Sequence, residues 1–162
     1  MIDLLRYARI EPNVLQVELH PYLAQKKLVA LCKTLGIALT AYSSLGPQSY
    51  VELGMHHSVP SLLEHDTISA IASATGKSTV SASPIVCKCL TSIYLGPAQV
   101  ILRWAVQQGL AIIPKSNNHD RLLSNLAVTS FELSEEQMKQ IDALDINLRV
   151  SCRDYHACLH VY

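Results

Sequence analysis

Four polar residues in the second half of the sequence have the types and the spacing of an anion-binding site. Lys115, Ser116 and Asn117 follow directly after a short apolar run. Arg121 lies in the first turn of the helical stretch that comes next, although cations are usually disfavoured at a helix N-terminus, where the backbone dipole is already positive. Two cations with hydroxyl and amide donors between them are expected where an anion binds. A solvated turn in which Asp120 balances Arg121 explains the same residues.

The elements around these residues alternate between strands and helices. Apolar alternation and short apolar runs predict strands at Val14–Leu19, Ile37–Tyr42 and Leu110–Ile113. Apolar residues at helical spacing predict the helices: Met1–Arg9, Gln25–Leu35, Leu62–Thr75, Pro97–Gln108 and Glu135–Leu144. Strands that alternate with helices form parallel βα units, so we predict an α/β fold.

Several residues indicate how these helices begin, end and face the core. Pro97 suits a first helical turn, and Gly36 suits the position after a last one. Ser134 and Gln137 have the spacing of a capping box. Two helices show an apolar face that we expect to be buried: Leu28, Leu31, Cys32 and Leu35 in the first, and Val100, Ile101, Trp104 and Ala105 in the second.

Polar side chains follow each predicted strand at the point where its apolar run stops. The three segments are Gln16–Tyr22, Tyr42–Ser49 and Pro114–Asn117. In parallel α/β folds, chemistry gathers at the carboxyl ends of the strands. We therefore expect the functional site where these three segments meet.

The composition suits one globular domain. The chain has 162 residues, of which 49% are hydrophobic and 16% charged, and its formal net charge is zero. These values argue against a disordered chain, and the dispersed Lys and Arg residues offer no surface to nucleic acid or to an anionic membrane. The sequence shows no signal peptide or membrane-length apolar run, so we expect a cytoplasmic protein. Five cysteines, an odd number, favour free thiols over a disulfide framework.

Three motifs, taken together and in order, resemble the aldo-keto reductases. They are Q-V-E-L-H-P-Y-L from Gln16, A-Y-S-S-L-G-P-Q-S from Ala41 and I-P-K-S-N-x-x-x-R-L-x-x-N from Ile113. The similarity is greatest to the fungal xylose (aldose) reductases and extends over about Leu4–Thr75 and Pro97–Arg149. Members of the family are (β/α)8 TIM barrels that reduce aldehydes and sugars with NADPH, some also with NADH. The resemblance implies a partial TIM barrel that is not closed, made of strands six to eight and their helices.

The resemblance also implies where the phosphate and adenine of NADPH bind. Lys115, Ser116, Asn117 and Arg121 would hold the adenosine 2′-phosphate. Asn125 would contact the adenine. This placement agrees with the general rule that TIM barrels bind phosphate near strands seven and eight.

The other end of the cofactor is expected at the first two motifs. Tyr42 would stack on the nicotinamide and Gln16 would hydrogen-bond its carboxamide. Without the resemblance, Tyr42 reads as a core aromatic residue and Gln16 as a paired strand residue. The remaining residues of the expected site line the pyrophosphate or, for the last of them, accept ribose hydroxyls: Ser43, Leu45, Gln48, Ser49 and Glu52.

The family's catalytic aspartate, tyrosine, lysine and histidine belong to earlier strands, and we assign none of them to this chain. His20 and Tyr22 match the H-P-Y that follows strand six, not the catalytic pair. The expected function is NAD(P)H-dependent reduction of a small aldehyde or aldose, with this chain keeping the cofactor-binding half. The alternative is a catalytically inactive fragment or a nucleotide-binding remnant. Three strands leave two unpaired edges, so we also expect marginal stability and self-association.

Two segments depart from the family pattern. One lies within the expected domain 1–149, and the other follows it. Thr79–Gly96 interrupts a helix–loop–helix, and the tail 150–162 replaces the usual ending. A Val-Ser pair, which a splice-donor-like GTRAGT can encode, occurs at both boundaries. We hypothesise that both segments are translated introns of a mis-spliced or truncated gene model. Genomic DNA without GT…AG boundaries at these codons would refute the hypothesis.

Four of the five cysteines fall in these two segments. Cys87 and Cys89 form one pair, and Cys152, His156, Cys158 and His160 form a second group of metal-ligand types. Neither spacing matches the two-residue knuckle of zinc sites, and no Gly-rich turn accompanies them. We therefore expect no metal centre.

Overall fold

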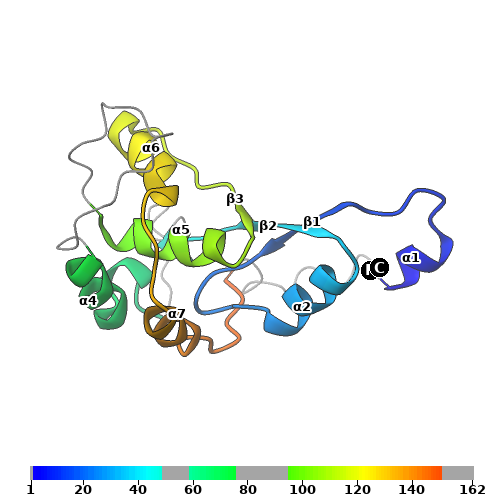
Figure 1. Ribbon diagram of the computed structural model, residues 1–162, viewed down its shortest axis with the longest axis horizontal. Coiled ribbons are helices and arrows are strands. Elements are labelled where there is room, and N and C mark those ends of the chain that lie inside the picture. Colours follow the sequence, from blue (N-terminus) through cyan, green and yellow to red (C-terminus); the bar gives the residue numbers. More distant parts are fainter. Residues whose placement is uncertain (1, 49–58, 76–94, 151–162) are drawn as a thin grey trace.

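The structure, a computed structural model, describes residues 2–48, 59–75 and 95–150 (Figure 1). Its sheet has three parallel strands, arranged in the order in which they occur along the chain: β1 (Val14–Glu18), β2 (Ala38–Tyr42) and β3 (Ala111–Ile112). The predicted parallel α/β arrangement is confirmed. β3 is shorter than predicted and ends just before Pro114, which has no N–H to donate to a strand ladder.

Helices separate the strands along the chain, as predicted. Their bounds are α1 (Ile2–Tyr7), α2 (Lys26–Thr34), α4 (Asp66–Thr75), α5 (Pro97–Gln107), α6 (His119–Leu126) and α7 (Glu135–Asp142), with short 3-10 turns η1 (Leu62–Glu64) and η3 (Ala127–Thr129). None of the helices in the described ranges is long and apolar enough to cross a membrane.

The single helix predicted over 62–75 is wrong, because the chain breaks at His65 between η1 and α4. His65 has extended backbone angles, and its Nδ1 accepts a hydrogen bond from the backbone N–H of Thr67 at 3.2 Å. The imidazole thus satisfies an amide in the first turn of α4, as a side-chain N-cap does. A histidine is not a usual capping residue, so the pattern of apolar residues concealed the break.

Other helix ends agree with the sequence. The Ser134 hydroxyl accepts from the Gln137 N–H at 3.2 Å, and the Gln137 side chain accepts from the Ser134 N–H at 2.8 Å. This is the predicted capping box, and it begins α7. Gly36 follows α2 with a φ of +69°, the left-handed conformation that ends many helices.

The core lies between the helices and one face of the sheet. Leu39 and Ala41 of β2 are buried there together with the predicted inward residues of α5, which include Trp104. In α2 the buried residues are Val29 and Cys32. Leu35 is 41% exposed, contrary to prediction, because it is the C-cap and lies beyond the last turn of the helix.

The opposite face of the sheet is open. Gln16, Ala38 and Ala111 are exposed on it, and Val14 and Ile113 expose 59% and 51% of their surface. These residues alternate with the core-facing ones, as strand geometry requires. Among the described residues, β1 and β3 also each leave one edge unpaired. The sheet is therefore an open one, as expected of three strands that cannot close a barrel.

This open face leads us to expect self-association that depends on its apolar side chains. The double substitution Val14→Lys and Ile113→Lys should shift the chain toward monomer, because charge on a sheet face and edge opposes pairing with another copy. Sedimentation velocity over a range of concentrations measures the shift. The control is Leu35→Lys, which places a charge on an exposed apolar residue at the C-cap of α2. A wild-type chain that is monomeric at all concentrations contradicts the prediction.

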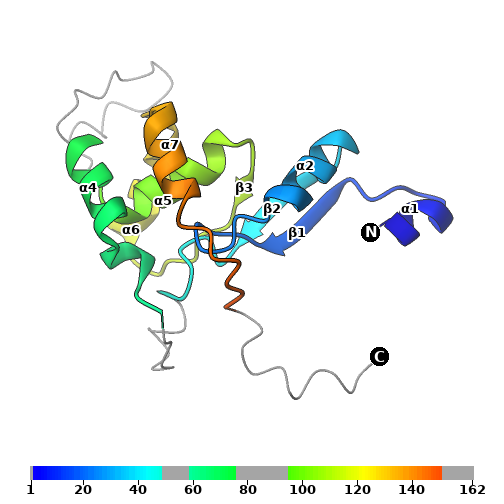
Figure 2. The same cartoon turned by 90° about the horizontal axis from the view of Figure 1, so that it is seen from below.

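Two features lie outside the sheet. α4 packs against α5, and Ile68 and Ile101 are fully buried in the shared core. The two views show these helices side by side (Figures 1 and 2).

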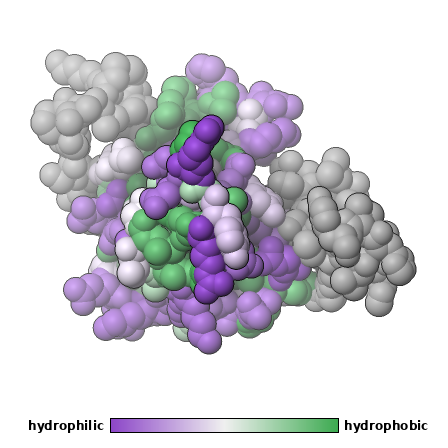
Figure 3. All heavy atoms as spheres, turned by 90° about the vertical axis from the view of Figure 1, so that its right-hand side faces the viewer, coloured by the Kyte–Doolittle hydropathy of each residue, from purple (hydrophilic) through white to green (hydrophobic). Residues whose placement is uncertain are grey.

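α1 lies at the far end of the molecule and buries none of its residues. Seen from that end, apolar side chains form a patch bordered by hydrophilic ones (Figure 3).

Candidate functional site

Polar residues follow both β2 and β3, at the end of the sheet where the carboxyl ends of these strands lie. Because the two strands are parallel neighbours, with Ala41 opposite Ile112, Tyr42 and Lys115 leave the sheet at the same end. Gln16 lies on β1 opposite Thr40, so it shares a face with Tyr42. Gln16 is exposed and Tyr42 is half-buried. Both side chains therefore lie on the open face of the sheet.

Two residues of the loop after β2 have left-handed backbone angles. Ser43 has a φ of +51°, in the left-handed region that residues other than glycine rarely adopt. Its carbonyl accepts from the Gly46 N–H at 2.8 Å. Gly46 has a φ of +67°, and a Cβ there would lie 2.7 Å from Cδ1 of the fully buried Leu62. Unusual backbone angles of this kind are often retained at ligand sites.

The other residues expected beside the pyrophosphate lie in the same loop or beyond it. Leu45 is half-buried and packs against the core. Gln48 accepts a hydrogen bond from the Ser61 hydroxyl at 2.9 Å, which ties this loop to the segment before η1. Ser49 and Glu52 lie outside the described residues.

The cationic segment after β3 forms a closed turn at the N-terminus of α6. Asn118 is the N-cap, and its side-chain oxygen accepts from the Arg121 N–H at 3.0 Å. The Ser116 hydroxyl in turn accepts from the Asn118 N–H at 3.2 Å. Lys115, Asn117 and Arg121 are exposed around this turn. Two positive side chains thus lie at the positive end of a helix dipole, which favours an anion.

Neighbouring contacts hold α6 in place. Asn125 is half-buried, and its side-chain oxygen lies 3.5 Å from the Gln99 amide nitrogen on α5. Asp120, considered above as a partner for Arg121, lies 3.7 Å from Nδ1 of His119. The face of α6 that carries Asn125 is therefore directed at α5.

Three polar residues with a part in this arrangement were not predicted. Asn118 caps α6, Gln99 contacts Asn125, and Ser61 binds Gln48. A signal existed for Asn118, since asparagine before a helical run is among the strongest N-caps. Gln99 and Ser61 act across large sequence separations, and no local pattern marks them.

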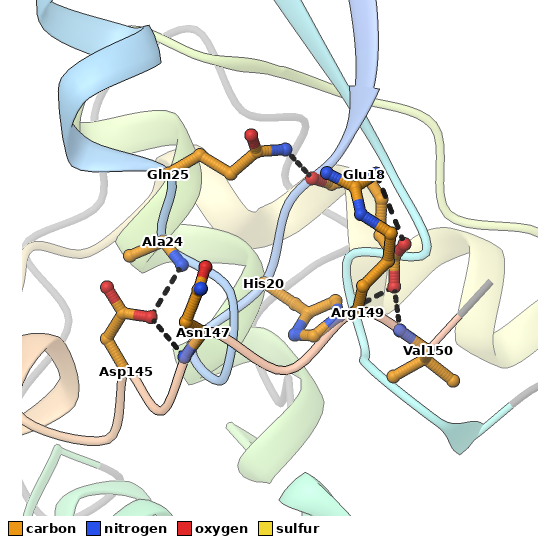
Figure 4. A network of polar contacts seen from close by, with 8 residues as sticks. All are labelled: Glu18, His20, Ala24, Gln25, Asp145, Asn147, Arg149 and Val150. Carbon is orange, nitrogen blue, oxygen red and sulfur yellow. Dashed lines mark hydrogen bonds and ion pairs between the residues drawn. The ribbon is translucent and has the colours of Figure 1, made fainter. Parts of the chain in front are cut away.

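A buried carboxylate and a buried imidazole lie where β1 ends (Figure 4). Oε1 of Glu18 is 3.2 Å from Nε2 of His20, and both side chains are fully buried. The Tyr22 hydroxyl donates to the Pro60 carbonyl at 3.3 Å, and burial raises the pKa of that hydroxyl above its usual value of 10.0. The side chains of His20 and Tyr22 are both buried.

Within the described ranges, no three His, Cys, Asp or Glu side chains are grouped so that they could hold a metal ion. The paired cysteines and the Cys/His tail considered above lie outside those ranges. Cys32, which lies within them, is a fully buried free thiol.

Comparison with known proteins defines the class to which this fold and site belong. A sequence model described as the Aldo/keto reductase family matches residues 1–146. The match extends over most of the chain, including all three strands and the segments that follow them. The chain belongs to the aldo/keto reductase family, whose fold is the TIM barrel.

Fungal D-xylose reductases are among the proteins similar to this chain. The chain is 52% identical over 149 residues to the NADPH-dependent D-xylose reductase of Meyerozyma guilliermondii, an alignment that covers 91% of this chain and 41% of that protein. It is 50% identical over 151 residues to the NAD(P)H-dependent D-xylose reductase of Scheffersomyces stipitis, covering 92% and 42%. The chain thus spans about two fifths of the length of these relatives.

Proposed function

We propose that this chain carries the cofactor-binding half of an NAD(P)H-dependent reductase that acts on a small aldehyde or an aldose. One observation supports the proposal most. Tyr42 and the cationic turn Lys115–Arg121 lie at the carboxyl ends of two neighbouring parallel strands. Family membership and the names of the similar reductases point in the same direction. NADPH is the proposed cofactor, and NADH is a second one.

In this proposal the cationic turn recognises the phosphate that distinguishes NADPH from NADH. Lys115 and Arg121 supply positive charge, and Ser116 and Asn117 supply neutral donors. An ammonium and a guanidinium beside hydroxyl and amide groups are a suitable donor set for a phosphate monoester. Asn125, on the same helix as Arg121, is proposed to contact the adenine.

The remaining residues are proposed to orient the other half of the dinucleotide. Tyr42 stacks on the nicotinamide ring and Gln16 binds its carboxamide, on the sheet face that the helices leave uncovered. The bound dihydronicotinamide supplies the hydride for carbonyl reduction. The residues proposed for the pyrophosphate and ribose come from the chain after β2: Ser43, Leu45, Gln48, Ser49 and Glu52.

Removal of one cation from the turn tests this assignment. Lys115→Ala should weaken NADPH binding by about tenfold or more and NADH binding much less, because a charge-assisted hydrogen bond contributes about 1.5–3 kcal/mol. Titration calorimetry with each nucleotide measures both affinities. Lys33→Ala, at an exposed lysine in the last turn of α2, is the matched control. An equal loss for NADPH and NADH would be evidence against a 2′-phosphate contact.

The second candidate is a catalytically inactive fragment that binds no dinucleotide. The coverage of about two fifths of the relatives' length favours it. The proposed insertion 79–96 and the proposed foreign tail 150–162 favour it as well. If the wild-type chain shows no heat of binding with NADPH or NADH, this candidate replaces the first.

A further inference from the structure

Glu18 joins the end of β1 to a segment near the C-terminal end of the described chain (Figure 4). Its Oε1 accepts a hydrogen bond from the backbone N–H of Val150 at 2.6 Å, and its Oε2 lies 3.9 Å from a guanidinium nitrogen of Arg149. The Glu18 side chain is fully buried. A buried carboxylate is costly unless donors and a positive charge surround it. The segment 145–150, which we call the C-terminal segment, supplies one of each.

The C-terminal segment is also attached to the turn that follows β1. The backbone carbonyl of Tyr22 accepts from the N–H groups of Ile146 and Leu148, at 3.3 and 2.9 Å. Asp145 accepts from the backbone N–H of Ala24 at 3.4 Å. These contacts lie along one side of the segment, and the contact of Glu18 with Val150 is the last of them. The segment therefore docks on the turn through contacts made one after another.

His20 also contacts the carboxylate of Glu18. Its Nε2 lies 3.2 Å from the same Oε1 that binds Val150, and its Nδ1 has no hydrogen-bond partner in the described part of the chain. The imidazole therefore gives its one polar contact there to Glu18. The Glu18 carboxylate thus connects His20 to the C-terminal segment.

The place of this network in the sheet connects it with the proposed cofactor site. Glu18 lies directly opposite Tyr42, on the same face of β1 as Gln16, but it is buried there whereas Gln16 is exposed. The residue that holds the C-terminal segment is thus the strand neighbour of Tyr42, which the proposed function assigns to the nicotinamide. That part of the inference rests on the proposed function, whereas the attachment itself does not.

We propose that Glu18 is a positioning residue whose carboxylate fixes the C-terminal segment at the end of β1. Without that carboxylate the segment detaches while the sheet and its helices remain folded. The role is local, because Glu18 supplies the last contact of the segment and none of the core packing of α5.

Trypsin tests the proposal on the whole chain without any nucleotide. The Arg149–Val150 peptide bond is a trypsin site whose N–H is held by Glu18, and Arg103, nine-tenths buried on α5, is a site that only wider unfolding opens. Glu18→Ala should speed cleavage after Arg149 by about tenfold or more, as expected when a charged hydrogen-bond acceptor is lost. Cleavage rates at both sites follow from mass spectrometry of the peptides released.

A conservative variant separates positioning from general destabilisation. Glu18→Gln keeps an oxygen for the Val150 N–H but no charge for Arg149. Trypsin should therefore cleave this variant after Arg149 at a rate between those of the wild type and Glu18→Ala. Cleavage after Arg103 should stay at the wild-type rate in Glu18→Gln. Glu11→Gln, at an exposed glutamate before β1, is the control and should change neither rate.

Two results would overturn the proposal. One is a wild-type rate of cleavage after Arg149 in Glu18→Ala. The other is a parallel increase at Arg103 and Arg149 in Glu18→Gln, which would make Glu18 a general core residue. Failure of NADPH to bind leaves both rates unaffected, so this test and that of the proposed function fail independently.

Discussion

The purified chain, supplied with NADPH and D-xylose or glyceraldehyde, is expected to oxidise NADPH no faster than a protein-free control. A positioned general acid contributes about 10²–10⁴-fold to the rate of such a reaction, and we assign that role to no residue described here. His20 is fully buried against Glu18. The Tyr22 hydroxyl donates a hydrogen bond to the Pro60 carbonyl, and the Tyr22 side chain is buried. The loss of NADPH absorbance with time measures the rate.

The Lys115→Ala variant is the control for this measurement, and a full-length fungal xylose reductase shows that the assay works. Turnover by the wild-type chain that Lys115→Ala reduces would contradict the prediction. It would mean that the chain contains an acid that the described residues do not reveal. Binding of NADPH without turnover is the result that the cofactor-half proposal predicts.

Trp104→Ala is expected to lower the free energy of unfolding by about 3–5 kcal/mol, which is typical when a large buried aromatic side chain is removed. Trp104 is the only tryptophan in the chain and is 1% exposed. Its indole N–H also donates to the Asp142 carboxylate at 2.8 Å, which joins α5 to the end of α7. Most small domains have only about 5–15 kcal/mol in total, so this loss is a large fraction of the stability, and we expect the variant to unfold at a much lower urea concentration than the wild type. Urea unfolding followed by circular dichroism measures the loss.

Trp104→Phe separates packing from hydrogen bonding. Phenylalanine keeps most of the apolar contact but has no N–H, so its loss of stability should be well below that of Trp104→Ala. The Asp142 carboxylate that it leaves behind is half-buried and reaches water easily. Equal losses for the two variants would show that the hydrogen bond, and not the packing, carries the effect.

The elements whose signals are local were predictable from the sequence. Ser134 and Gln137 specify the start of α7 within four residues, and Gly36 marks the end of α2 in the same way. The inward face of α5 follows from helical periodicity, and its members are buried as predicted. The meeting of Tyr42 and Lys115 at one edge followed from a general property of parallel sheets, without any knowledge of the pairing register.

Features that lack a usual sequence signal, or that depend on distant parts of the chain, could not be predicted. The break at His65 comes from a side chain that accepts a hydrogen bond where a helix-compatible pattern continues. The environment of Glu18 is set by Val150, a separation of 132 positions, and no periodicity encodes it. Contact of Gln48 with Ser61 likewise arises only once the loop after β2 folds back. In the candidate site, therefore, sequence gives the ends of the strands but not the contacts between them.

The packing of α4 against α5 has a consequence for how this family can vary. α4 ends at Thr75 and α5 begins at Pro97, and the two helices lie side by side. When the ends of a connection are already held together, each doubling of its length costs only about 0.6 kcal/mol. Residues such as the proposed insertion 79–96 can accumulate there with little penalty. This connection is thus a permissive point of the architecture, at which new exons, tags or whole modules could be accommodated.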